Sequence, residues 1–286
     1  MQSDSDGNAV AASSPRANEG AASRVPCSQG NVRQASRRLA EAAATGVPCS
    51  PVRDLVGDDD TAAAYAVQKI NIEDRVRQGA RIVGRKIGLT SPAVQRQLGV
   101  SQPDFGVLLD DMHVAPGDVI PTTGLIQPRI EAEIAFVLTS DIDDPEVDGI
   151  QAVKYIDHAV ACLEIVDSRI AGWDISFADT VADNASSARF VLSGQPVSLE
   201  SFEPRAVKMQ MFANDEVISA GDGTQCLGDP LNALAWLART AIGFDDPLRA
   251  GQIVLSGALG PMTPVQAGTR VVADLTSLGS VDVFFA

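Results

Sequence analysis

The sequence predicts an α+β protein in which an N-terminal helical segment precedes a larger, strand-rich domain. Two long runs within residues 31–79 carry helix caps and helix-ending glycines. From about Asp104 onward the chain changes to short apolar runs separated by turns such as "APGD", "SGQP" and "AGTR". The chain has 286 residues, which is long enough to bury a substantial core.

Composition excludes several classes of function. The formal net charge of −15 disfavours nucleic acid and anionic membrane surfaces as partners, and a small anionic substrate would need a local cation. No apolar run approaches the roughly 20 residues that cross a bilayer. The four cysteines form no C-x-x-C pair and fit reduced thiols in a cytoplasmic protein. With only two histidines, chemistry that requires a histidine cluster is nearly excluded.

The N-terminal part divides into a tail and two helices. Residues 1–32 are predicted as a disordered tail, because they are rich in Ser, Ala, Asn and Gly. Residues 33–79 form the helical segment, and residues 80–286 form the main domain. The run "NVRQASRRLAEAAATG" predicts a helix that ends at Gly46, and "DDDTAAAYAVQKINIEDRVRQG" predicts a second helix that ends at Gly79.

The main domain is predicted to begin with a strand in "ARIVGRKIGLT", followed by a short helix in "SPAVQRQLG". A late helix is predicted in "PLNALAWLARTAIG", with Asp229 as its cap. The runs "GQIVLSG", "TRVVADL" and "GSVDVFFA" are predicted as closing strands. The glycines of "SGALG" indicate turns, because no Gly-Lys-Ser/Thr follows them as in a phosphate loop.

Two glutamates stand out in the apolar run "QPRIEAEIAFVL", residues 127–138. In a strand, Glu131 and Glu133 share one face, roughly 7 Å apart, and Ile130, Ala132 and Ile134 line the other. A single E-x-E pair is consistent with a solvated sheet face. Buried and unpaired, however, two carboxylates would need a proton or a cation.

A second strand-like run, "HAVACLEIVDSRI", carries Glu164 at its centre, on a face shared with Cys162 and Val166. Three glutamates within two such strands form an oxygen-rich set of ligands. Such a set suits a hard divalent cation, Mg²⁺ or Mn²⁺, that keeps positions open for water or substrate.

Further polar residues extend this constellation. Lys86 lies between glycines in "GRKIGLT", where its amine either reaches the surface or serves a site. The segment "DTVADNASS", from Asp179 to Ser187, is predicted as a polar loop. Asp104, in "QPDFG", is either a turn residue or part of the site.

These segments, together with "CLGDPLNALAWLART" and "LRAGQIVLSGALGPM", resemble the 2-keto-4-pentenoate (2-hydroxypenta-2,4-dienoate) hydratases. That family belongs to the fumarylacetoacetate hydrolase superfamily, as do the 4-oxalocrotonate decarboxylases. The resemblance covers about Leu39 to the C-terminus. It implies a mixed β-roll or sandwich with flanking helices, and homo-oligomers.

The resemblance also implies roles for individual residues. Glu131, Glu133 and Glu164 would bind the metal, Lys86 would lie beside the substrate, and Asp104, Asn184 and Ser186 would line the pocket. The hydrolases of the superfamily use a His–Glu pair to activate water. No matching histidine occurs here, so C–C hydrolysis is disfavoured.

The implied activity is that of a hydro-lyase in aromatic-compound meta-cleavage catabolism. Its substrate is a 2-hydroxy-2,4-dienoate, whose tautomer 2-oxopent-4-enoate takes up water at C4 to give a 4-hydroxy-2-oxo acid. Lys86 is predicted as the general acid/base, with its pKa lowered by the metal, and Asp104 as a group that orients Lys86 or water. The alternatives are a 4-oxalocrotonate-type decarboxylase and a non-catalytic oxo-acid-binding subunit.

Overall fold

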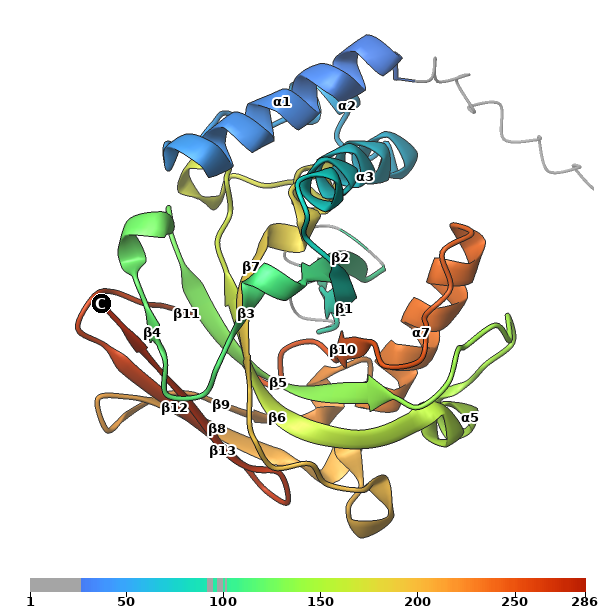
Figure 1. Cartoon of the computed structure of the whole chain (residues 1–286), viewed down its shortest axis with the longest axis vertical. Helices are drawn as coiled ribbons and strands as arrows, with labels where there is room; N and C mark the ends of the chain where they lie inside the picture. Colours follow the sequence, from blue (N-terminus) through green and yellow to red (C-terminus); the bar gives the residue numbers. More distant parts are fainter. Residues whose placement is uncertain (1–26, 92–94, 97–99, 101) are drawn as a thin grey trace, which may run out of the picture.

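The architecture of the chain was obtained as a computed structural model that describes residues 27–91, 95–96, 100 and 102–286. Two β-sheets form its centre, and helices cover their margins (Figure 1). The predicted α+β class and the β-roll with flanking helices are confirmed. Among the described residues, no helix is both long and apolar enough to cross a membrane.

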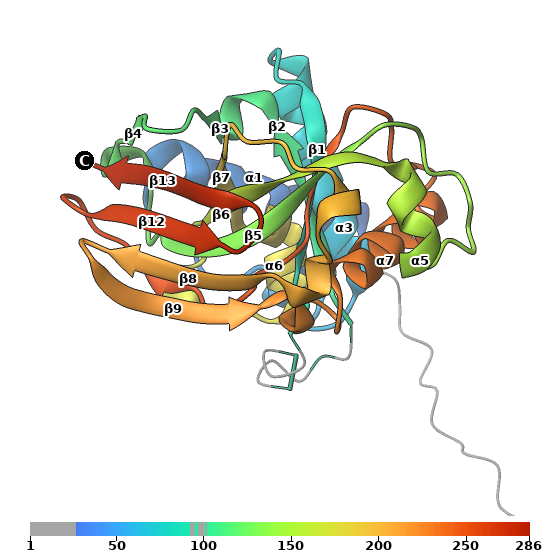
Figure 2. The same ribbon diagram turned by 90° about the horizontal axis from the view of Figure 1, so that it is seen from below.

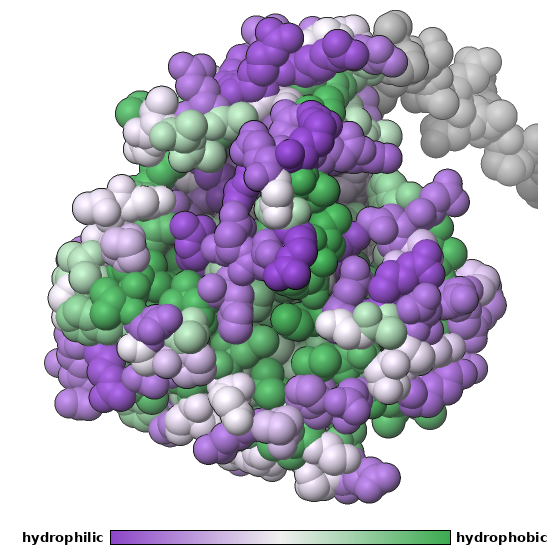
Figure 3. Space-filling model, in the orientation of Figure 1, coloured by the Kyte–Doolittle hydropathy of each residue, from purple (hydrophilic) through white to green (hydrophobic). Residues whose placement is uncertain are grey.

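The N-terminal helices pack on one another above the larger sheet. Helix α1 contacts α3, and α3 contacts α6, which comes much later in the chain (Figure 1). The outward surfaces of α1 and α3 are hydrophilic (Figure 3). The helices are α1 (Gln29–Thr45), α2 (Arg53–Val56), α3 (Thr61–Arg77), α5 (Gly149–Ala152), α6 (Phe177–Ala182) and α7 (Pro230–Gly243).

Local capping explains where these helices begin and end. The Asp60 side chain accepts a hydrogen bond from the N–H of Ala63 at the start of α3, and Asp229 does the same for α7. Gly46 ends α1 in the left-handed conformation, with φ of 69°. The predicted ends of these helices are therefore confirmed to within a few residues.

The predicted boundary of the tail is wrong at its C-terminal end. Ser28 caps α1 by accepting a hydrogen bond from the N–H of Asn31, so residues 29–32 belong to this helix. Residues 1–26 lie outside the described part of the chain. So does most of the short helix predicted in "SPAVQRQLG".

The larger sheet has eight strands in the order β2-β1-β10-β5-β6-β7-β3, with β11 paired to β5 off this path. Its two longest strands, β5 and β6, pair antiparallel and curve across the molecule (Figure 1). The strands are β1 (Ile82–Gly88), β2 (Asp104–Leu109), β3 (His113–Val114), β5 (Arg129–Leu138), β6 (Ile156–Val166), β7 (Ser187–Leu192), β10 (Ile253–Leu255) and β11 (Thr263–Pro264).

The smaller sheet has five strands in the order β4-β13-β12-β8-β9. It packs beside the larger sheet, with β12 and β13 in contact with β6 (Figure 2). The strands are β4 (Val119–Ile120), β8 (Lys208–Ala213), β9 (Glu216–Asp222), β12 (Arg270–Leu275) and β13 (Gly279–Phe285).

The alternation of side chains along β5 separates two apolar clusters. Ile130, Ala132 and Ile134 belong to the main core, whereas Ala135, on the face of the glutamates, belongs to a second cluster. Cys162 of β6 lies in that second cluster too. The predicted division of β5 into an apolar face and a glutamate face is confirmed, and the second face is covered as well.

Candidate active site

The register of β5 and β6 brings the three glutamates together. Glu131 pairs directly with Glu164, and Glu133 pairs with Cys162. Residues directly opposite in an antiparallel pair share a face, with Cβ atoms roughly 5 Å apart. One carboxylate oxygen from each glutamate lies within 4.8 Å of the others. The sequence placed all three on strands, and the pairing makes them one cluster.

Each of the two deeply buried glutamates is anchored by one oxygen only. Glu133 Oε2 accepts a hydrogen bond of 2.6 Å from the N–H of Gly257, and Glu164 Oε1 accepts one of 2.9 Å from Ser187 Oγ. Glu133 Oε1 and Glu164 Oε2 are buried without a hydrogen-bond donor among the described residues. Glu164 Oε2 forms an ion pair with Lys86 Nζ at 3.2 Å, whereas Glu133 Oε1 has neither a donor nor an ion pair among these residues and therefore needs a cation or a proton.

The electrostatics of the cluster give the same result. Burial raises the pKa of Glu131 from 4.5 to about 8. The repulsion by Glu164 adds to this rise, and the attraction by Lys86 opposes it without cancelling it. Burial and the charges of Glu164 and Glu131 raise the pKa of Glu133 well above its usual range. A divalent cation would neutralise these charges, and three carboxylates are the donor set that Mg²⁺ and Mn²⁺ accept. The residues present fit such an ion.

Lys86 reaches the cluster from β1. Its side chain is 3% exposed, and Nζ lies 3.2 Å from Glu164 Oε2. Burial lowers the pKa of Lys86, but Glu164, Glu131 and two further carboxylates raise it by more, so the net direction is upward. This direction belongs to the metal-free protein, in which the carboxylates are uncompensated. The lowering of the Lys86 pKa by a bound metal ion stays a prediction.

Two glycines create the space that Lys86 and Asp104 occupy. In the β1–β2 pair, Lys86 lies opposite Gly106 and Asp104 lies opposite Gly88, so each polar side chain faces a glycine on the neighbouring strand. A Cβ on Gly88 would lie 2.1 Å from Asp104 Oδ1 and 3.6 Å from Lys86 Nζ. Both polar groups therefore lie over Gly88, and the backbone comes close enough to the site only because no side chain intervenes.

Asp104 is held by one oxygen, like the glutamates. Its Oδ2 accepts a hydrogen bond of 3.2 Å from Thr180 Oγ1, and its Oδ1 has no donor among the described residues. Burial raises the pKa of this carboxyl, and Lys86 and Thr180 oppose the rise. Asp104 is thus a buried residue of the cavity wall and not a solvated turn residue.

The segment predicted as a polar loop forms α6 and a 3-10 turn, Asn184–Ser186. Asp179 is structural, because its carboxylate accepts hydrogen bonds from the N–H groups of Val52 and Arg53. The turn itself is left-handed, with φ of 50° to 55° at residues 184–186. This uncommon backbone turns Ser186 into the cavity, and its buried Oγ has no partner among the described residues.

The prediction that Asn184 contacts substrate is not supported. Its side-chain amide donates to the carbonyl of Val107 and its amide oxygen accepts from the N–H of Val107, at 3.0 and 2.7 Å. It does not line the cavity. Asn184 instead fastens the turn to β2, which places the neighbouring Ser186.

One cavity of about 740 Å³ adjoins the glutamate cluster. Its walls include the predicted Lys86, Asp104, Glu131 and Ser186. They also contain residues that were not singled out from the sequence: Arg129, Val166, Trp173, Ile175, Thr180 and Met262. Arg129 could have been found, because it lies two residues before Glu131 and so points to the same face of β5.

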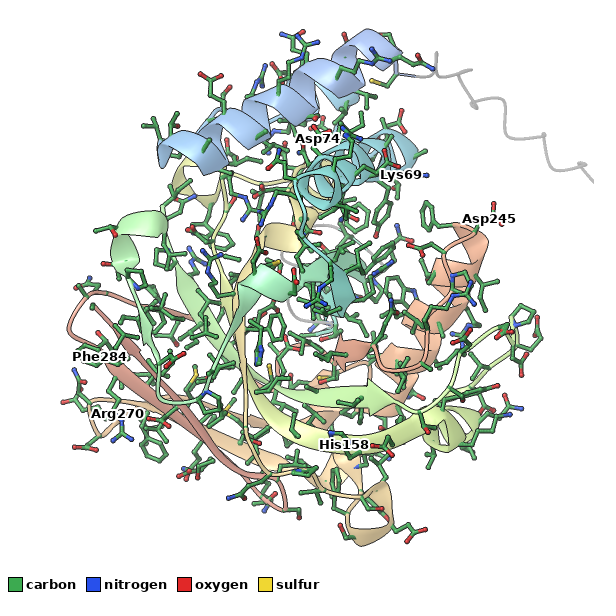
Figure 4. All side chains as sticks on the ribbon, in the orientation of Figure 1. Lys69, Asp74, His158, Asp245, Arg270 and Phe284 are labelled. Carbon is green, nitrogen blue, oxygen red and sulfur yellow. The ribbon has the colours of Figure 1, made fainter. Side chains whose placement is uncertain are left out.

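Neither histidine contributes to this cavity. His158 lies on β6 (Figure 4). Its ring contacts the carboxylate of the adjacent Asp157, and His113 stacks on Phe190. Apart from Arg129, the ionisable side chains among the described cavity residues are therefore one lysine and two carboxylates, Lys86, Asp104 and Glu131. This agrees with the expectation that a His–Glu pair for water activation is missing.

Comparisons with known proteins agree with this geometry. The chain is 49% identical over 255 residues to 2-keto-4-pentenoate hydratase from Burkholderia vietnamiensis strain G4, covering 89% of this chain and 97% of that one. It is 49% identical over 257 residues to the TodF product hydratase of Pseudomonas putida F1, covering 90% and 96%.

A solved structure, 4-oxalocrotonate decarboxylase from Pseudomonas putida G7 in complex with magnesium and adipate, superposes with a TM-score of 0.86. It is 32% identical, and the match covers 91% of this chain and 98% of that chain. The family described as fumarylacetoacetate (FAA) hydrolase C-terminal matches residues 78–283. The chain belongs to the fumarylacetoacetate hydrolase family.

Proposed function

We propose that this protein is a metal-dependent hydratase of the 2-keto-4-pentenoate hydratase type. It adds water to a 2-hydroxy-2,4-dienoate, as its tautomer 2-oxopent-4-enoate, and gives a 4-hydroxy-2-oxo acid in meta-cleavage catabolism. The observation that carries the proposal is the lysine within 3.2 Å of a three-glutamate cluster in a cavity with no histidine. Hydratase relatives at 49% identity over most of the chain support the same reaction.

Glu131, Glu133 and Glu164 would hold Mg²⁺ or Mn²⁺. When bound, the ion supplies positive charge that stabilises the negative charge developing on the C2 oxygen of the substrate. Glu131 is the most accessible of the three and lines the cavity, whereas Glu133 and Glu164 are fully buried. This arrangement leaves the cavity side of the cluster open to substrate.

Lys86 is the group that moves a proton. It is the one lysine among the described cavity residues, and its ammonium lies at the edge of the glutamate cluster, where a dienoate would place its reacting carbons. We assign it delivery of the proton at C5 and uptake of the proton of the water that attacks C4. The free oxygens of Asp104 and Ser186 are positioned to orient Lys86 and that water.

The runner-up activity is decarboxylation of a 4-oxalocrotonate-type acid. The similarity to the decarboxylase of Pseudomonas putida G7 favours this second candidate, but the identity of 32% is lower than that to the hydratases. The two reactions share charge stabilisation on a C2 oxygen, so the carboxylate cluster alone does not separate them.

The test is to incubate purified protein with Mg²⁺ or Mn²⁺ and either 2-hydroxypenta-2,4-dienoate or 4-oxalocrotonate. We expect loss of dienoate absorbance with formation of 4-hydroxy-2-oxopentanoate, identified by NMR, and no release of CO₂ from 4-oxalocrotonate. Stoichiometric CO₂ release without hydration of the dienoate would replace the hydratase by the decarboxylase.

Two coarser features belong to the same proposal. The four free cysteines fit a reducing compartment, so we place the enzyme in the cytoplasm. We also propose a homo-oligomer. Light scattering of the purified chain at several concentrations tests the oligomer, and a mass equal to a single chain throughout would contradict it.

A further inference from the structure

One cationic side chain in the cavity has no assigned role in the chemistry above. Arg129 lies at the start of β5 and lines the cavity together with Glu131. Its backbone belongs to the sheet, but its guanidinium makes no hydrogen bond or ion pair with any described residue. Its guanidinium is partly buried and has no carboxylate partner among the described residues, so its charge is not compensated within the described part of the protein.

This lack of a partner is unusual within the molecule. The other described arginines that are buried or partly buried each donate a hydrogen bond: Arg38, Arg53, Arg85, Arg169 and Arg189. An arginine has five N–H donors in a fixed, planar arrangement. Keeping all of them free of protein acceptors beside a cavity suggests that an acceptor arrives with the ligand.

The guanidinium is nevertheless fixed in position. Its central carbon lies 4.3 Å from the centroid of the Trp173 ring, a cation–π contact that leaves the N–H groups free. The indole is held in turn, because Trp173 Nε1 donates a hydrogen bond of 3.1 Å to the carbonyl of Gln127. The Gln127 side chain accepts from Gly172 and donates to Ser168, which ties the turn that carries Trp173 to the start of β5.

The position of Arg129 relative to the other groups selects its ligand. Lys86 and Asp104 approach the glutamate cluster from β1 and β2, whereas Arg129 precedes Glu131 at the far end of β5. A substrate that turns its reacting carbons C4 and C5 toward Lys86 points its C1 carboxylate toward Arg129. Guanidinium and carboxylate match as a bidentate pair, and in a chain with a net charge of −15 such a local cation favours an anionic ligand.

We propose that Arg129, laid against Trp173, binds the C1 carboxylate of the 2-oxo acid substrate. The identity of the substrate rests on the proposed function, but the binding of a 2-oxo carboxylate does not require hydration. Arg129 is then a specificity residue: it selects acids over esters and amides of the same carbon skeleton, and it sets which end of the substrate faces Lys86.

The experiment measures binding and not turnover. Pyruvate serves as a short, unreactive 2-oxo acid and methyl pyruvate as its neutral ester, both titrated by calorimetry into Mg²⁺-loaded protein. In Arg129→Gln we expect pyruvate to bind about 10- to 100-fold more weakly, the usual effect of losing a charged hydrogen-bond pair. Methyl pyruvate should bind equally to both proteins, and Mg²⁺ affinity should stay within about 3-fold.

Arg189→Gln is the matched control, since Arg189 is also a partly buried arginine of the same sheet but lies outside the cavity. It should leave pyruvate binding unchanged. Trp173→Leu tests the supporting ring, and we expect a smaller loss of pyruvate affinity in the same direction.

Three results would overturn the assignment. Unchanged pyruvate affinity in Arg129→Gln would remove its role, and an equal loss for the ester would make its role structural. A loss confined to 2-oxoadipate, a dicarboxylate, would place Arg129 at the distal end of the substrate. If Arg129 controls pyruvate affinity but the dienoate is not hydrated, the proposed function fails and this inference stands.

Discussion

Replacing Lys86 by Met tests the catalytic centre most directly. Methionine keeps an unbranched, apolar stem of similar length, so it fills the space between Gly88 and Gly106 while removing the ammonium. If Lys86 moves the proton, kcat should fall by about 10²-fold or more, the usual share of general acid–base catalysis. The loss should appear mainly in kcat and not in KM, because the proton is transferred in the transition state.

The same substitution should also change stability, and the structure gives the direction. The Lys86 ammonium lies 3.2 Å from Glu164 Oε2, and both side chains are almost fully buried. Removing one partner of a buried pair costs about 3–5 kcal/mol. In chelator we therefore expect a drop in Tm on the order of 10 °C. Saturating Mg²⁺ should reverse most of this drop, since the ion neutralises the stranded carboxylate.

The assay combines steady-state kinetics on the dienoate with thermal unfolding in chelator and in Mg²⁺. Lys208→Met is the matched control, because Lys208 is an exposed lysine on β8, outside the cavity. Lys86→Arg should not rescue turnover, since a guanidinium does not release its proton near neutral pH. Near-normal kcat in a folded, metal-loaded Lys86→Met protein would refute the role of Lys86 and shift proton transfer to Asp104 or to a water at the metal site.

Four further predictions concern the metal, pH, packing and the tail. Chelation should abolish turnover, and Mg²⁺ or Mn²⁺ should restore it; full activity in metal-free protein would contradict this. Glu133→Gln should weaken Mg²⁺ binding measured by calorimetry, whereas Glu216→Gln, at an exposed position, should not. The pKa of Glu131 is raised from 4.5 to about 8 in the metal-free native state. Between pH 4.5 and about pH 8, Glu131 therefore keeps its proton in the native state but loses it in the unfolded chain. The Tm of the metal-free protein should therefore fall as pH rises from 5 to 9, and the Tm of Glu131→Gln should fall less. Identical dependence of Tm on pH in the two proteins would argue against the raised pKa of Glu131. Gly88→Ala places a Cβ 2.1 Å from Asp104 Oδ1, so the carboxylate must move by more than about 1 Å and turnover should fall about 10²-fold. Gly194→Ala, with open space around it, should leave turnover unchanged. Deleting residues 1–26 should leave Tm and turnover unchanged, since these residues are poor in large apolar side chains. A chain that begins at Asn31 should lose about 1 kcal/mol of its free energy of unfolding, because it lacks the Ser28 cap of α1.

Local rules were sufficient to predict the elements and the chemical type of the site. The helix at Pro230–Gly243 was predicted with its bounds and its Asp229 cap, because capping and periodicity are properties of adjacent residues. Alternation along β5 likewise assigned Glu131 and Glu133 to one face. Three glutamates in apolar strands then indicated a hard divalent cation before any distance was known.

The tertiary structure decided what each polar residue does. Nothing local sets the pairing that places Glu131 opposite Glu164, or the position of Lys86 over Gly88, because strand register depends on contacts between distant parts of the chain. For the same reason Asn184 and Asp179 were predicted in a polar loop, whereas they are structural.

Arg129 shows the same limit most clearly. Its sequence position gives the face of β5. Only the folded chain shows that no carboxylate of the described residues pairs with it, and that Trp173, 44 residues away by their numbers, supports its guanidinium. A residue's type and spacing determine which chemistry it can perform. Which partners it finds, and which of its donors stay free for a ligand, follow from long-range packing, since that packing sets the distances, the burial and the local charge on which the chemistry depends.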